Sequence, residues 1–339
     1  MFNSTTQRSG FLAGGNFIVD SVKIIDKWPE QDTLSTILHT KRSNGGGPYN
    51  FLKNLARLAP AISRDAVGLL GNDVEGDWVR NDCRAAGIGI DQLTVEDGLT
   101  TSLTDVMTVA DTGRRTFFHS RGANAHLEAH HFDFGKTSAR VFMLGYLMLL
   151  DRLDILESNG TTGASRLLKA ARQHGLLTAV DCVSVEHPQF REIATASLVE
   201  ADVFFVNDVE ASKILGKQVD KANVEMALLE IVKLGARGTV VLHMPKGAFA
   251  LNAEKNAVLK QPSLNIPKEQ ISGASGAGDA FAAGYLYGLH EGWSTQESLI
   301  CGVCVAAKSL FSPTPSDGLG TVESCLKLEE QYGYSEISR

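Results

Sequence analysis

The sequence lacks the features that typify membrane, nucleic-acid-binding and secreted proteins. Its apolar runs, such as residues 141–150, fall far short of the ~20 residues that a membrane helix needs. It has no dense run of Lys or Arg, and its net charge of −7 disfavours a nucleic-acid partner. The first ten residues do not join a charged segment to an apolar one, so we expect no signal peptide.

Cysteine and linker-like sequence are also scarce. The chain has 339 residues and five cysteines, an odd number that predicts reduced thiols and a cytoplasmic location. No Pro-, Gly- or Ser-rich linker divides the chain, and no internal repeat is evident. We therefore expect one domain over residues 11–320, preceded by a disordered tail at residues 1–9. A hydrophobic content of 43% suffices for a sizeable core.

The hydrophobic pattern changes along the chain. Early apolar segments rich in Thr, Leu, Ile and Val predict strands at 11–19, 33–40, 100–109 and 116–120, around a helix at 49–58. From about residue 138, predicted strands alternate with helices. The strands are 139–144, 177–181, 203–206 and 238–242, and the helices are 163–174, 190–198, 209–215 and 224–234. Such alternation predicts a parallel sheet covered on both faces, with the early strands as a small appendage.

A glycine-rich segment near the C-terminus carries the most chemical information. Residues 272–284 read Ser-Gly-Ala-Ser-Gly-Ala-Gly-Asp-Ala-Phe-Ala-Ala-Gly, and a helix is predicted at 280–289. Glycines before a helix N-terminus let backbone N–H groups form an anion site. A carboxylate there, Asp279, can accept the proton of an attacking hydroxyl. The alternative is a structural turn in which Asp279 only caps the helix.

This segment resembles the Asp-Thr-x-Gly-Ala-Gly-Asp motif of the ribokinase-like, or PfkB-type, carbohydrate kinases. Further motifs of that family occur in the expected order, and the resemblance spans roughly residues 11–320. They are Gly15-Asn16 with Asp20, the run from Asn44 to Asn50, Gly71-Asn72-Asp73 with Gly76, the run from Arg121 to Asn124, and Asn207 with Glu210.

The resemblance implies a three-layer α/β/α fold with a central, mostly parallel sheet and a small β-sheet lid at about residues 20–42 and 99–121. It implies ATP-dependent phosphorylation of a sugar hydroxyl, with Mg²⁺ as cofactor and a possible homodimer formed through the lid. The implied site residues are the base Asp279; the anion hole Gly276, Ala277 and Gly278; the substrate ligands Asp20, Gly46, Gly47 and Asn50; and Asn207 and Glu210, which organise Mg²⁺ and phosphates without binding the metal directly.

Two departures from the family pattern leave alternatives open. Gly273 and Ala274 replace the first Asp and Thr of the glycine-rich motif, so we expect little dependence on potassium. In the loop at 242–247, Leu242 and Met244 replace smaller or polar residues, which favours weak ATP binding. The alternatives are a nucleoside kinase of the same fold and a non-catalytic relative that only binds a sugar.

Overall fold

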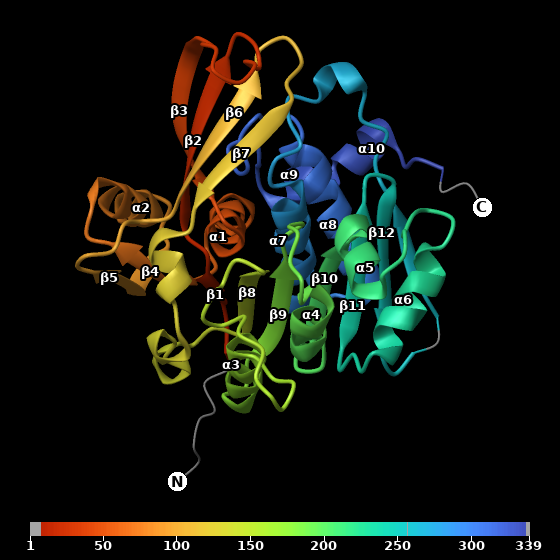
Figure 1. Cartoon of the computed structure of the whole chain (residues 1–339). Coiled ribbons are helices and arrows are strands. Elements are labelled where there is room, and N and C mark those ends of the chain that lie inside the picture. Colours follow the sequence, from red (N-terminus) through yellow and green to blue (C-terminus); the bar gives the residue numbers. More distant parts are fainter. Residues whose placement is uncertain (1–7, 256, 337–339) are drawn as a thin grey trace.

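The computed structural model describes residues 8–255 and 257–336, and it contains two β-sheets (Figure 1). The main sheet has nine strands in the order β13-β12-β11-β10-β9-β8-β1-β4-β5. Neighbouring strands are parallel from β5 to β11, and β12 and β13 add an antiparallel edge. The strands are β1 (Phe11–Gly15), β4 (Arg64–Gly71), β5 (Gly89–Glu96), β8 (Val141–Leu147), β9 (Leu177–Cys182), β10 (Val203–Asn207), β11 (Thr239–Met244), β12 (Gly247–Asn252) and β13 (Leu259–Pro262).

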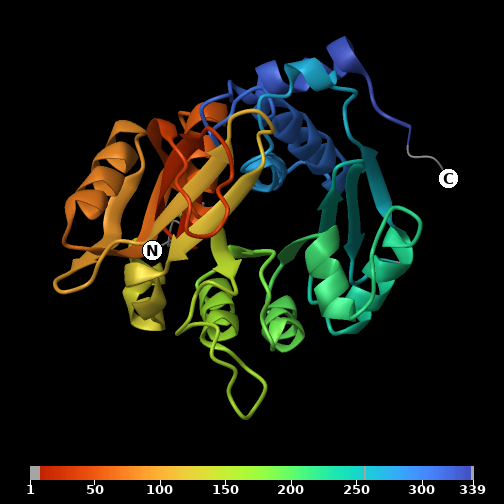
Figure 2. The same ribbon diagram turned by 45° about the horizontal axis from the view of Figure 1, so that its top comes forward.

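Helices cover both faces of this sheet, as Figure 2 shows. One face carries α1 (Gly47–Leu58), α2 (Val74–Ala85), α7 (Ala277–His290), α8 (Thr295–Ser309) and the short helices α9 (Val322–Leu326) and α10 (Leu328–Tyr332). The other face carries α3 (Gly163–Gln173), α4 (Phe190–Leu198), α5 (Asp208–Leu215) and α6 (Val224–Lys233). The expected three-layer arrangement is therefore confirmed.

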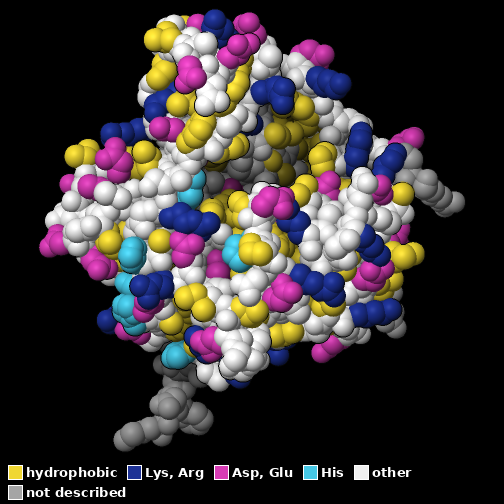
Figure 3. Space-filling view, viewed as in Figure 1, with side chains coloured by type: hydrophobic (Ala, Val, Ile, Leu, Met, Phe, Trp, Pro, Cys, Tyr) yellow, Lys and Arg dark blue, Asp and Glu magenta, His cyan; other side chains and the backbone are white. Residues whose placement is uncertain are grey.

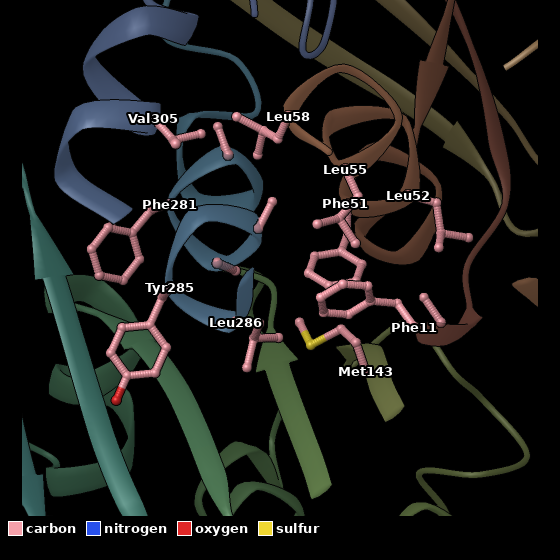
Figure 4. Packing of buried hydrophobic residues seen from close by; sticks show 14 of the residues in the cluster. Phe11, Phe51, Leu52, Leu55, Leu58, Met143, Phe281, Tyr285, Leu286 and Val305 are labelled. Atoms are coloured by element: carbon pink, nitrogen blue, oxygen red, sulfur yellow. The ribbon is translucent and has the colours of Figure 1, made fainter. Parts of the chain in front are cut away.

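The two cores follow from the alternation of side chains along each buried strand. Phe11 and Ala13 of β1 belong to the core beneath α1 and α7, whereas Leu12 belongs to the core beneath α3 and α4. Figure 4 shows Phe11 and Met143 of the sheet meeting Phe51 of α1 and Leu286 of α7. This packing fixes α1 and α7 side by side, with both helix N-termini at the same edge of the sheet.

The small sheet has the strand order β3-β2-β6-β7. Its strands are β2 (Ile18–Ile25), β3 (Ile37–Gly45), β6 (Leu103–Val109) and β7 (Arg115–Ser120). β2 follows β1 directly along the chain, and β3 leads directly into α1. The small sheet therefore stands at the edge of the main sheet where β1 ends and α1 begins.

The structure corrects several boundaries. The strand predicted at 11–19 is two strands in different sheets, because the chain leaves the main sheet after Gly15 and joins the small sheet at Ile18. The strand predicted at 33–40 begins only at Ile37. The inner strand β4 and the edge strand β5 had no predicted counterpart. The expectation of a disordered tail falls largely on residues 1–7, which lie outside the described residues.

Candidate active site

A cavity of about 470 Å³ lies at the carboxyl ends of the parallel strands, beneath the small sheet. Open α/β sheets bind ligands at this edge because the loops and helix N-termini after the strands converge there. The space-filling view shows the surface hollowed between the small sheet and the rest of the molecule (Figure 3). Every residue predicted for the site lines this cavity except Gly47.

Asp279 lines the cavity from the first turn of α7. It is only 5% exposed, and it accepts hydrogen bonds from Nδ2 of Asn50 at 2.8 Å and from the hydroxyl of Tyr146. Burial raises the pKa of Asp279 to about 6, against the lowering effect of the bonds from Tyr146 and Asn50. A carboxylate with this pKa is ionised at neutral pH and can accept a proton.

A chain of hydrogen bonds fixes which end of the Asn50 amide faces Asp279. Nδ2 of Asn44 donates to Oδ1 of Asn50 at 2.7 Å, and the hydroxyl of Ser316 donates to Oδ1 of Asn44 at 3.0 Å. Because Oδ1 of Asn50 is already used as an acceptor, its Nδ2 group points to the carboxylate. Asn50 is thus neither a helix cap nor a surface residue: it lies inside α1, whose N-cap is Gly46.

The glycine-rich turn forms the N-terminus of α7 beside Asp279. Gly276 is the N-cap and has φ 75°, and a Cβ atom there would lie 2.6 Å from Cβ of Pro315. The first N–H groups of a helix have no carbonyl of a preceding helical turn to bind. Here the N–H of Ala277 makes only a long bond, 3.4 Å, to the carbonyl of Ala274, and Gly276, Ala277 and Gly278 all line the cavity. A Cβ atom on Gly278 would lie 3.1 Å from Cε1 of His243. The turn therefore offers backbone donors, with no side chain in the way, to an anion.

Asp20 also lines the cavity, from β2 of the small sheet. Burial raises the pKa of Asp20 to about 7. A hydrogen bond from Thr104 acts to lower this pKa, and the negative charge of Asp279 raises it further. Oγ1 of Thr104 lies 2.9 Å from Nδ1 of His119 on the neighbouring strand. Asp20 thus belongs to a polar group on the small sheet and lies in a strand rather than in a turn.

Asn207 and Glu210 form a capping box at the start of α5. The side chain of Asn207 accepts from the N–H of Glu210, and Oε2 of Glu210 accepts from the N–H of Asn207, both at 2.9 Å. Oε1 of Glu210 also accepts from the hydroxyl of Ser184 at 2.8 Å. Glu210 is only 2% exposed, so it is not a surface helix residue.

Asp181, at the end of β9, adds a fourth carboxylate to the cavity. Burial and the charges of Glu210 and Asp279 hold its pKa well above the usual range. Burial likewise raises the pKa of Glu210 to about 7. In the part of the chain that the structure describes, no cluster of three or more His, Cys, Asp or Glu side chains could hold a metal ion.

Three residues named from the sequence have a different environment from the expected one. Gly47 does not line the cavity; a Cβ atom there would lie 2.8 Å from the ring of Tyr146, so the glycine makes room for that ring. Leu242 is fully buried in the core, and neither Leu242 nor Met244 lines the cavity. The residue of that loop that does line it is His243. The lining of the cavity thus gives no support to the expected weak ATP binding, which stays a prediction.

Sequence reasoning missed Tyr146, Asp181 and His243, all of which line the cavity. Each is at or beside the carboxyl end of a parallel strand, namely β8, β9 or β11. The rule that ligands bind at these strand ends could have identified them, because their strands were predicted. Motif positions alone could not.

The comparisons with known proteins agree with this geometry. Residues 15–320 match the model of the pfkB family carbohydrate kinases. The chain is 24% identical to the 5-dehydro-2-deoxygluconokinase of Clostridium perfringens, over 85% of this chain and 86% of that protein. It is 26% identical to mouse ketohexokinase, over 88% of this chain and 94% of that protein.

The fold is also similar to that of solved ribokinases. The ribokinase of Arabidopsis thaliana, in a complex with ribose and ATP, superposes with a TM-score of 0.76 at 21% identity. The superposition covers 95% of this chain and 98% of the ribokinase. Because the family model covers nearly the whole chain, this protein belongs to the pfkB family of carbohydrate kinases, ATP-dependent enzymes that phosphorylate a hydroxyl group of a sugar or sugar-like substrate.

Proposed function

We propose that the cavity binds a polyhydroxylated acceptor between the small sheet and Asp279, and the phosphates of ATP at the N-terminus of α7. The observation that carries this proposal is the position of Asp279. Its carboxylate is held by Asn50 and Tyr146 at the junction of two groups of lining residues. One group, with Asp20, comes from the small sheet, α1 and β8, and the other, with Glu210, comes from β9, β10, α5 and β11.

In this proposal Asp279 is the general base. Its carboxylate takes the proton of the acceptor hydroxyl as the hydroxyl oxygen bonds to the γ-phosphorus, and the bond from that phosphorus to the bridging oxygen breaks to release ADP. The N–H groups of Gly276, Ala277 and Gly278 stabilise the negative charge on the transferred group. Asp20, Gly46 and Asn50 bind the acceptor, and Gly47 acts only by admitting the ring of Tyr146.

The buried carboxylates on the donor side fit a divalent cation. Asp181 and Glu210 line the cavity with raised pKa values, so a positive charge between them and the phosphates would favour their ionised forms. When bound, Mg²⁺ would neutralise phosphate charge in the transition state. Glu210 and Asn207, fixed by their capping box, would organise it through water rather than as direct ligands.

We also infer that the small sheet acts as a lid that excludes water when both substrates are bound. It contributes Ile18, Asp20, Thr104, Phe117 and His119 to the cavity, while the other lining residues belong to the main body. None of the described helices is long and apolar enough to cross a membrane. All five cysteines are buried free thiols, which supports the proposal of a reducing, cytoplasmic setting.

An ADP-release assay tests this function. We expect ADP formation to require ATP, Mg²⁺ and a polyhydroxylated acceptor together, with a phosphorylated acceptor as the second product. A matched calorimetric titration of the same acceptors separates this function from simple sugar binding. Acceptor binding without ADP release would support the non-catalytic alternative and contradict the proposal.

A further inference from the structure

Both oxygens of the Asp279 carboxylate accept hydrogen bonds from other side chains of the protein. Oδ2 accepts from Nδ2 of Asn50 at 2.8 Å, and Oδ1 accepts from the hydroxyl of Tyr146. In the proposed reaction an acceptor hydroxyl must reach this carboxylate to pass on its proton. Because Asp279 is only 5% exposed, little of it is left for a third donor. One of the two donors therefore has to move away when an acceptor binds.

Asn50 is held in place at both ends of its amide. Its Oδ1 accepts from Asn44, and Oδ1 of Asn44 accepts from the hydroxyl of Ser316. Asn50 is buried inside α1. Turning its amide away from Asp279 would break this chain and leave buried polar groups without partners, which costs free energy. Asn50 is therefore the donor that stays.

Tyr146 is the donor that can move. Among the described residues, its hydroxyl bonds only to Asp279, and its partly exposed ring lines the cavity. Its backbone is fixed, because its N–H donates to Oδ1 of Asn16, and Nδ2 of Asn16 donates to the carbonyl of Leu149 at 3.0 Å. The side chain can therefore turn on a fixed backbone, with the cavity beside it.

Tyr146 also covers a second place at which an acceptor is expected. The family resemblance implies that Gly47 contacts the acceptor. Here a Cβ atom on Gly47 would lie 2.8 Å from Cε1 of the Tyr146 ring, so the ring lies against the Gly47 backbone. Tyr146 thus fills one expected acceptor contact with its ring and another, on Asp279, with its hydroxyl.

The bond from Tyr146 keeps the base occupied. Burial and the negative charge of Asp279 hold the pKa of Tyr146 well above its usual range, so the hydroxyl keeps its proton and remains a donor. While Asp279 accepts this bond, a water molecule in the cavity has no free base to take its proton. Attack of water on ATP is then slow.

We propose that Tyr146 guards the base: its hydroxyl holds Asp279 until the hydroxyl of an acceptor displaces it. Tyr146 is thus a positioning residue, and the inference rests on the proposed function. An acceptor can move the tyrosine because its other hydroxyls bind Asp20 and its ring replaces the tyrosine ring at Gly47. A single water molecule brings no such additional binding energy.

Hydrolysis of ATP without an acceptor tests the guard directly. In Tyr146→Phe, Asp279 takes a proton from water, the water oxygen bonds to the γ-phosphorus, and the bond to the bridging oxygen breaks to give ADP and phosphate. With only ATP and Mg²⁺ present, this variant should release ADP about tenfold faster than the wild type or more. An unchanged or lower rate overturns the inference.

Two further variants control this measurement. The hydroxyl of Tyr49 also donates to a carboxylate, that of Asp82, but neither residue lines the cavity, so Tyr49→Phe should hydrolyse ATP at the wild-type rate. The double variant Tyr146→Phe/Asp279→Asn should lose the gain, because it lacks the base. A gain that appears in Tyr49→Phe, or persists in the double variant, contradicts the guard.

Acceptor kinetics separate the guard from a merely structural role. With D-ribose, D-fructose and adenosine as the acceptors, KM and the calorimetric Kd should fall about threefold or more in Tyr146→Phe, because no hydroxyl has to be displaced. Its kcat should stay within about threefold of the wild-type value. A lower kcat with unchanged affinity would place the Tyr146 hydroxyl on Asp279 during transfer and overturn the inference.

The outcomes distinguish this inference from the proposed function. Acceptor phosphorylation by the wild type, with Tyr146→Phe behaving like Tyr49→Phe, would leave the kinase function intact and overturn only the guard. The hydrolysis result decides on the guard whether or not one of the three acceptors is a substrate. An absence of ADP release from every variant under all these conditions would contradict both proposals.

Discussion

At the residue scale, the arrangement around Asp279 determines its charge. Desolvation favours the protonated carboxyl, whereas the donors from Tyr146 and Asn50 favour the carboxylate. The sequence did not predict either hydrogen bond to Asp279. Asn50 was predicted as a sugar ligand, and Tyr146 was not predicted as a site residue. The structure brings both residues onto one carboxylate, because α1 and the end of β8 lie next to the N-terminus of α7.

The first prediction concerns the pH dependence that this arrangement produces. A protonated Asp279 cannot accept a proton, so kcat/KM should be maximal above its pKa and fall as the pH drops through about 6. Tyr146→Phe removes a hydrogen bond that lowers this pKa, and the acidic limb of the profile should move to higher pH. Tyr332→Phe is the control, because the Tyr332 hydroxyl donates to Gln270 outside the cavity. An acidic limb that stays in place in Tyr146→Phe would contradict the assignment.

The sequence allowed most candidate site residues to be named, but not their partners. The motifs at 15–20, 44–50, 207–210 and 273–279 were recognisable because each depends on a local backbone shape or a fixed spacing. The links between them are long-range hydrogen bonds, such as the one from Asn50 to Asp279 across 229 residues of chain. Nothing in a local pattern encodes such pairs, so the hydrogen bonds from Asn50 and Tyr146 to Asp279 emerged only from the fold.

At the element scale, the glycine-rich turn and α7 act as a unit. Gly276→Ala should destabilise the protein by about 1–3 kcal/mol, since φ 75° is unfavourable for alanine and Cβ would contact Pro315. Because the turn must shift, its N–H groups lose their alignment, and kcat should fall tenfold or more. Thermal unfolding and steady-state kinetics measure the two effects.

Gly292→Ala is the matched control for this variant. Gly292 has φ 82°, but a Cβ atom there would meet nothing within 4 Å, and the residue follows the opposite end of α7. It should reproduce the backbone strain without the loss of kcat. Equal kinetic losses in the two variants would show that the effect comes from stability rather than from the turn.

The same turn carries the prediction on monovalent cations. Gly273 offers no side-chain oxygen where the family motif has a carboxylate, so activity should change little when KCl is varied at fixed ionic strength in sodium-free buffer. Restoring the Asp would require Pro313 and Ser312 to move by a few tenths of an ångström, because a Cβ atom on Gly273 would lie 3.1 Å from Cα of Pro313 and 3.2 Å from the carbonyl oxygen of Ser312. Saturable potassium activation would show that other oxygens form the cation site.

Helices and strands with a clear period were predicted closely, and the others were not. α4 occupies the range predicted for it, and α3 and α6 each end one residue before their predicted ends. β4 and β5 were missed because β4 includes two glycines and β5 has exposed polar positions, so neither has a strong apolar run. The break after Gly15 was also missed, since the apolar residues continue across it although the chain changes sheets.

At the scale of the whole molecule, the parallel sheet brings together residues that are far apart in the sequence. The order β11-β10-β9-β8-β1 brings the donor-side carboxylates and the acceptor-side residues to one edge, with Asp279 between them. A homodimer formed through the small sheet stays a prediction, which light scattering of the purified protein can test. The account of catalysis does not depend on it.

The most direct test of the account is the kinetic effect of Asp279→Asn. The substitution keeps the shape and removes the base, so kcat should fall by ~10²–10⁴, and toward the upper half of that range because the carboxylate also orients the nucleophile. Acceptor binding measured by calorimetry should change much less, since Asp20 and Asn50 carry most of the hydroxyl recognition. A variant that keeps more than about a tenth of the wild-type kcat, a loss smaller than any in that range, would contradict the account.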